Sequence, residues 1–200
     1  MTWNNFKLVI VSFLLIFIYP MPWSYADYPM AENINFIIRV PASTCVISPV
    51  NVMVLDEIDG ARLAETNWKT IALKDIEINL HSCVYYAGSS GTPKIKITAA
   101  AGTYAMSNTN NLLYRNTGST ATGFGIAVFN TVSPAVDTSS TSQMVKSGDI
   151  IWQGSLNEKF ASRKVYISTG VSCGPRANCS PDKLSSGALN AKFTLDFLYD

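Results

Sequence analysis

The last nine residues of the chain, 192–200, read KFTLDFLYD, and this stretch decides the fold class. Apolar side chains stand at every second position, at Phe193, Leu195, Phe197 and Tyr199. Successive side chains of a β-strand point to opposite faces, so the alternation predicts a strand with one face in a core. The sequence stops one residue later, at Asp200. We therefore expect this strand to pair with strands formed earlier in the chain or with another molecule.

The rest of the chain favours strands as well. Short β-branched runs alternate with clusters of Gly, Asn, Ser, Thr and Pro, at intervals typical of a β-sandwich, so we predict an all-β fold. Residues 56–67 are predicted as a surface connection, with one turn of helix as the weaker alternative, and residues 133–143 and 173–186 as loops. The predicted strands are residues 34–40, 50–55, 68–83, 94–100, 112–115, 125–130, 150–153, 164–169 and 189–198.

The apolar positions within residues 68–83 change parity. Ile71 and Leu73 stand at odd positions, whereas Ile76, Ile78 and Leu80 stand at even ones. A strand keeps one parity, so an extra residue near Lys74 and Asp75 is required, either as a β-bulge or as a break between two strands. The same pattern directs His81 outward.

The N-terminus has the pattern of an export signal. Lys7 precedes the apolar run LVIVSFLLIFI at residues 8–18, which is shorter than the ~20 residues of a membrane-spanning helix. Ser24 and Ala26 are small residues at the positions a signal peptidase reads, so residues 1–26 are predicted to be removed. Residues 27–200 suffice for one domain with a substantial core.

The charge of the chain limits its partners. The formal net charge is +1, and without Lys7 the exported part is neutral. A neutral, mixed surface argues against nucleic acid or an anionic membrane as the main partner.

The four cysteines, Cys45, Cys83, Cys173 and Cys179, lie after the export signal, where thiols are oxidised. We expect two disulfides. Three pairings are possible, and spacing favours Cys45 with Cys83 and Cys173 with Cys179. On the loop-entropy model, the longer bridge contributes about 4 kcal/mol and the shorter one about 2 kcal/mol.

No group of residues has the pattern of a catalytic or metal site. The single histidine, His81, has no glycine-rich nucleophile motif around it. Cys173 and Cys179 have neither redox nor zinc spacing, and the acidic cluster Asp56, Glu57 and Asp59 lacks calcium-loop spacing. We therefore expect no catalytic residue, no cofactor and no bound metal.

Four segments carry a resemblance to a known family. They are INFIIRV at 34–40, IEINLHSC at 76–83, LLYRNTGSTATGFGIAVFN at 112–130 and SGALNAKFTLDFLYD at 186–200. In this order and spacing, they resemble the subunits of bacterial pili assembled by the chaperone–usher route, the type 1-like pilins.

The resemblance implies an incomplete immunoglobulin-like sandwich that lacks its last strand and is completed by a donor strand. In that family, a periplasmic chaperone first fills the groove and anchors the C-terminal carboxylate, and the N-terminal extension of the next subunit then replaces it at the outer-membrane usher. The fibre is a pilus (fimbrium) on the cell surface.

Carried over by position, the resemblance makes residues 27–44 the donor extension and 45–200 the pilin domain. It supports the Cys45–Cys83 bridge. The implied donor residues are Ile34, Phe36, Ile38 and Val40, and the implied chaperone-binding strand contains Phe193, Leu195, Phe197, Tyr199 and Asp200.

Two departures from the family pattern indicate a minor or specialised subunit. Ile38 stands where many relatives carry glycine, and the Cys173–Cys179 loop is an addition. The alternative is a single-domain tip adhesin that binds a host glycan or receptor through the Cys173–Cys179 loop or through aromatic side chains at Trp68, Tyr85, Tyr86 and Tyr104.

Overall fold

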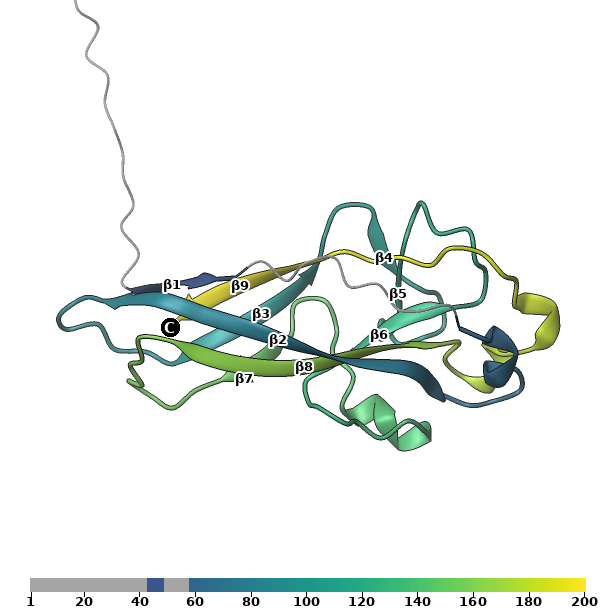
Figure 1. The fold of residues 1–200 in the computed structure, drawn as a ribbon, viewed down its shortest axis with the longest axis horizontal. Helices are drawn as coiled ribbons and strands as arrows, with labels where there is room; N and C mark the ends of the chain where they lie inside the picture. Colours follow the sequence, from purple (N-terminus) through teal and green to yellow (C-terminus); the bar gives the residue numbers. More distant parts are fainter. Residues whose placement is uncertain (1–42, 49–57) are drawn as a thin grey trace, which may run out of the picture. The chain divides into compact units, whose positions relative to one another are not determined.

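The structure of the protein is a computed structural model that describes residues 43–48 and 58–200. Within these residues the chain forms two antiparallel sheets (Figure 1). The six-stranded sheet has the order β1 (Ser43–Ile47), β2 (Thr70–Tyr85), β8 (Arg163–Ser172), β6 (Gly125–Phe129), β5 (Tyr114–Asn116) and β4 (Thr103–Ala105). The three-stranded sheet has the order β7 (Ile150–Gln153), β3 (Pro93–Ala99) and β9 (Phe193–Tyr199). The all-β prediction is confirmed.

The helical parts are short 3-10 turns: η1 (Gly60–Leu63), η2 (Thr138–Ser142), η3 (Arg176–Asn178) and η4 (Pro181–Lys183). No helix among the described residues is long and apolar enough to cross a membrane. The predicted connection before β2 contains one of these turns, η1. The Asp59 carboxylate caps it by accepting a hydrogen bond from the Ala61 amide. Leu63 in this turn is fully buried, which the surface prediction missed.

The parity change is a β-bulge in β2. Pairing with β8 shifts between Ile71 and Lys74, so the bulge lies slightly earlier than expected, and β2 continues unbroken to Tyr85. Ala72 in the bulge has a φ of 53°. The bulge turns the later residues over, so that Ile78 and Leu80 are buried and His81 is exposed, with Nδ1 3.1 Å from the Ser82 hydroxyl.

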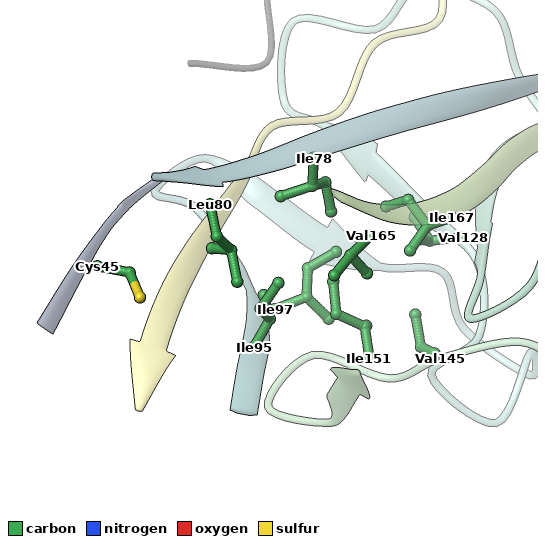
Figure 2. Close-up of a cluster of buried hydrophobic side chains, with 10 residues drawn as sticks. All are labelled: Cys45, Ile78, Leu80, Ile95, Ile97, Val128, Val145, Ile151, Val165 and Ile167. Carbon is green, nitrogen blue, oxygen red and sulfur yellow. The ribbon is translucent and has the colours of Figure 1, made fainter. Parts of the chain in front are cut away.

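The main core lies between the two sheets (Figure 2). The larger sheet contributes Cys45, Ile78, Leu80, Val128, Val165 and Ile167, and the smaller sheet contributes Ile95, Ile97 and Ile151. Val145, before β7, completes the cluster. The disulfide between Cys45 and Cys83 joins β1 to β2 beside this core. β1 begins at Ser43, two residues before the predicted domain boundary.

Some strand limits differ from the predictions. β4 has only three residues, too few for a periodic signal, and was missed. β8 runs to Ser172 rather than residue 169, because Gly170, Val171 and Ser172 are buried in pairing with β2 and β6. Leu112 and Leu113 precede β5 and are buried as a separate cluster rather than as strand residues. The predicted strands at 34–40 and 50–55 lie outside the described residues.

Candidate functional site: an apolar groove beside the last strand

β9 lies at the edge of its sheet. It pairs with β3 over its whole length, from Phe193 opposite Ala99 to Tyr199 opposite Pro93. In the described part of the chain, no strand pairs with its other edge. An unpaired edge exposes a row of backbone donors and acceptors that can hydrogen-bond to an added strand. β9 therefore has the backbone geometry to receive one.

A groove of about 1370 Å³ lies next to the first half of β9. Inner-face residues of β8 and β6 contribute to its lining, including Ile167, Thr169 and Val171 from β8. Phe193 and Leu195 of β9 also line it, and both side chains are only half-buried. The other apolar lining residues from the two sheets are Ile76, Ile97, Ile126 and Val128.

The lining selects an apolar occupant. The charged residues among the described lining are Asp59 and Lys192. The Thr169 hydroxyl donates to the carbonyl of Ala127, 2.9 Å away, so this polar group is already satisfied by the protein. An extended segment with alternating apolar side chains would bury them here and pair its backbone with β9.

One side of the groove is formed by residues 181–192, which we call the strap. Residues 184–192 of the strap were predicted to be partly loop and partly strand, but they run alongside residues 116–122 instead. Thr120 donates to the carbonyl of Ala188 at 2.8 Å, and Asn116 donates to that of Asn190 at 2.7 Å. The predicted strand 189–198 is therefore wrong at its start: the β3 ladder begins at Phe193, and Asn190 hydrogen-bonds to Asn116 and Ser119 instead.

A second segment of the lining is residues 58–64, around η1. Ile58, Gly60, Ala61 and Ala64 line the groove there. Sequence reasoning placed neither this segment nor the strap in a site. The sequence contains one indication that the strap lines a site. Leu184, Ala188 and Leu189 are apolar residues within a stretch otherwise rich in Gly, Ser and Asn.

The second half of β9 is closed by the chain itself. Phe197 packs against the main core, and the Tyr199 ring meets Tyr85 edge to face, with 5.3 Å between ring centroids. The Asp200 carboxylate lies 2.7 Å from Nζ of Lys94. Of the residues predicted for chaperone binding, Phe193 and Leu195 thus face the groove, whereas Phe197, Tyr199 and Asp200 have partners within the chain. The predicted donor residues Ile34, Phe36, Ile38 and Val40 lie outside the described residues.

The alternative aromatic platform does not assemble. Trp68 packs against the cluster of Leu112 and Leu113, and Tyr85 contacts Phe160 and Tyr199. Tyr86 and Tyr104 are exposed at 45% and 47%, but Tyr86 follows β2 and Tyr104 lies on β4. Three strands separate β2 from β4 in the sheet, so these two rings do not form a common surface.

The cysteines and acidic residues considered in the sequence do not come together in one cluster in the described part of the chain. No group of three or more His, Cys, Asp or Glu side chains within 43–48 and 58–200 could hold a metal ion. Cys173 and Cys179 form a disulfide and both are fully buried. Asp59 caps η1, and Asp56 and Glu57 lie outside the described residues.

Comparison with known proteins identifies the fold. No protein-family model matches the sequence, and no curated protein sequence matches it significantly. Among solved structures, the P pilus rod subunit PapA is similar at 18% identity with a TM-score of 0.53, covering 78% of this chain and 99% of PapA. A chaperone–usher pilus structure is similar at 19% identity with a TM-score of 0.53, covering 86% of this chain and 98% of that one. The chain thus has the immunoglobulin-like fold of chaperone–usher pilus subunits.

Proposed function

We propose that this protein is a structural subunit of an adhesive chaperone–usher pilus, and that subunits join by donor-strand exchange. The observation that carries the proposal is the coincidence of two features: an edge of β9 with which no described strand pairs, and an apolar groove beside Phe193 and Leu195. The fold shared with PapA supports the same function. In this proposal, an extended segment of a neighbouring subunit occupies the groove.

The segment that enters the neighbour is residues 27–42. Its apolar residues Ile34, Phe36, Ile38 and Val40 stand at every second position, so in a strand they share one face. Burying each of these side chains in the groove would contribute about 1.5–3 kcal/mol. The backbone of the segment would complete the hydrogen bonds of β9 at the same time.

Assembly then requires protection of the groove before polymerisation. A half-buried apolar face beside a strand edge that the described strands leave unpaired promotes aggregation, so a periplasmic chaperone that covers both is the expected first partner. The outer-membrane usher and the neighbouring subunits follow, and the product is a fimbrium on the cell surface. Ile38 and the Cys173–Cys179 loop favour a minor or specialised position in this fibre.

The test compares two single substitutions in the exported full chain. Phe36→Asp places a carboxylate on the face that enters the groove, where an unpaired charge is costly to bury. Asn35→Asp adds the same charge to the opposite face of the segment, one residue away. Assembly of chaperone-bound subunits is followed by light scattering and size-exclusion chromatography.

We expect Phe36→Asp to remain chaperone-bound and folded but to stop assembly, and Asn35→Asp to assemble as the unsubstituted chain does. Equal assembly of both variants would mean that residues 27–42 are not the donor segment.

A further inference from the structure

We infer that the Cys173–Cys179 disulfide sets the width of one end of the groove and thereby selects the size of the side chain that docks there. The inference rests on the proposed function. It names the occupant as residues 27–42 of a second copy of this chain.

The disulfide lies in a small core of its own. Both cysteines are fully buried and pack with Leu63, Phe124 and Val171. Phe124 and Val171 also line the groove, so this cluster lies directly behind the groove surface. The end of the groove that it supports, which we call the clasp end, is lined by Ile58, Ala61, Ala64, Ala121, Pro181 and Leu184.

The η1 side of the clasp end is attached to the disulfide loop. The amide of Glu65 donates to the carbonyl of Cys179 at 2.8 Å, and the amide of Trp68 donates to that of Gly174 at 2.7 Å. Leu63, between the groove-lining residues Ala61 and Ala64, is fully buried in the cysteine cluster. Movement of the disulfide loop would therefore move this side of the groove.

The strap side is attached to the same loop. The strap begins two residues after Cys179, and Nζ of Lys183 donates to the carbonyl of Ala177, inside the loop, at 2.7 Å. Leu184 and Leu189 pack against the cysteine cluster. Because both sides of the groove are held by one disulfide loop, the loop fixes the distance between them.

Close contacts keep the clasp end from adjusting to a different occupant. A Cβ atom added to Gly60 would lie 2.7 Å from Cζ of Phe124, and one added to Gly187 would collide with the backbone nitrogen of Ala121. Interiors packed this closely respond to the loss or gain of a single methylene. The clasp end is therefore a size-selective pocket for one side chain of the docked segment.

Residues 27–42 fit this groove in the spacing of their apolar side chains. The apolar residues of this segment stand two positions apart. The groove-lining residues Ile167, Thr169 and Val171 of β8 have the same spacing, because both follow the two-residue repeat of a strand. Ile34 and Val40 are the first and last of the four apolar side chains, so one of them reaches the clasp end and the other reaches the Leu195 end.

A double-mutant cycle tests the coupling between the disulfide and one terminal side chain. The protein is the exported full chain with Phe36→Asp, which keeps its own extension out of other grooves, with and without Cys173→Ala and Cys179→Ala. It is purified in complex with its chaperone, which the peptide displaces from the groove. The probes are a fluorescent peptide of residues 27–42 and its Ile34→Ala and Val40→Ala variants, and dissociation constants are measured by fluorescence anisotropy.

We expect removal of the disulfide to weaken binding of the unsubstituted peptide about tenfold. Of the two substitutions, Ile34→Ala and Val40→Ala, one should weaken binding at least tenfold more when the disulfide is present than when it is absent. The other should raise the dissociation constant by the same factor in both proteins. Equal effects of both substitutions in both proteins would overturn the inference and leave the proposed function intact. Failure of the peptide to bind the disulfide-containing protein would instead contradict the proposed function.

A second variant keeps the test decisive if loss of the disulfide unfolds the protein. Ala64→Leu fills the clasp end without touching the cysteines. It should weaken binding of the unsubstituted peptide at least tenfold. The peptide whose alanine substitution removes the side chain that docks at the clasp end should bind this variant more tightly than the unsubstituted peptide does. Unchanged affinity for all three peptides would overturn the inference.

Discussion

The backbone amide of Ser147 donates a hydrogen bond of 2.6 Å to the hydroxyl oxygen of Tyr114. The same hydroxyl donates to the carbonyl of Asn111 at 2.6 Å, and the Tyr114 side chain is almost fully buried. The ring of Tyr114 also meets Phe193 edge to face, 5.3 Å between centroids. One side chain thus links the six-stranded sheet, the segment before β7 and the groove side of β9.

Tyr114→Phe keeps this ring but removes the hydroxyl. The Ser147 amide and the Asn111 carbonyl then lose this partner. A hydrogen bond contributes about 0.5–1.5 kcal/mol net, so loss of the two should lower the free energy of unfolding by about 1–3 kcal/mol in a urea titration. Tyr104→Phe is the matched control, because Tyr104 lies on the neighbouring strand β4 and is 47% exposed. Its effect should stay within about 0.5 kcal/mol. Equal effects of the two substitutions would contradict a bridging role for the Tyr114 hydroxyl.

The stability of the protein should depend on the ionisation of Glu77. This residue pairs with Tyr166 across β2 and β8, and its carboxylate accepts hydrogen bonds from Lys164, Asn79 and Tyr166. These bonds, that of Lys164 foremost, lower the pKa of Glu77 from 4.5 to about 2. A carboxyl with a lowered pKa stabilises the fold above its ordinary pKa and loses that contribution as the pH falls toward the lowered value.

Thermal unfolding of the unsubstituted chain and of Glu77→Gln at a series of pH values tests this dependence. The difference in melting temperature should be present at pH 6 and should shrink between about pH 4.5 and 2. Lys164→Met should show the same loss of pH dependence, because it removes the main cause of the shift. A constant difference across this range would show that Glu77 contributes through packing instead.

The two disulfides should differ in their effect on stability. Cys45–Cys83 closes a loop with a sequence separation of 38, and Cys173–Cys179 one of 6. On the loop-entropy model these constrain the unfolded chain by about 4 and about 2 kcal/mol, out of a typical stability of about 5–15 kcal/mol. Replacing both members of the first pair with alanine should abolish accumulation of the exported protein, whereas the second double variant should accumulate at a reduced level. Quantitative immunoblotting of periplasmic extracts gives the measurement.

Deletion of residues 198–200 should abolish capture by the chaperone. It removes the pairing of Leu198 with Lys94 and of Tyr199 with Pro93, and it shifts the terminal carboxylate by three residues. Co-purification with the chaperone is the readout. Asp200→Asn is the control, since it keeps the terminal carboxylate and loses only the ion pair with Lys94, which is worth about 0–1 kcal/mol at the surface. Capture of the deleted chain would exclude the C-terminus as the anchoring point.

Local periodicity accounts for what the sequence alone could determine. Side chains alternate along a strand whatever its neighbours are, so the pattern of Phe193, Leu195, Phe197 and Tyr199 was sufficient to predict β9. The parity change in residues 68–83 predicted either a bulge or a break between two strands, because an extra residue is needed to reverse the faces, and the structure contains the bulge. The sequence separation of the cysteines favoured the pairing that the structure contains.

Only the tertiary structure decided where the groove lies and what forms its sides. Residues 58–64 and the strap are more than a hundred positions apart and have no common periodicity, so no local pattern relates them. Asn190 hydrogen-bonds to Asn116 and Ser119, and β9 begins only at Phe193, although the alternation of the sequence already starts at Leu189. Small residues such as Ala64 and Gly187 resemble ordinary loop residues in the sequence. They become groove-lining residues only because the folded chain brings both segments to one disulfide loop.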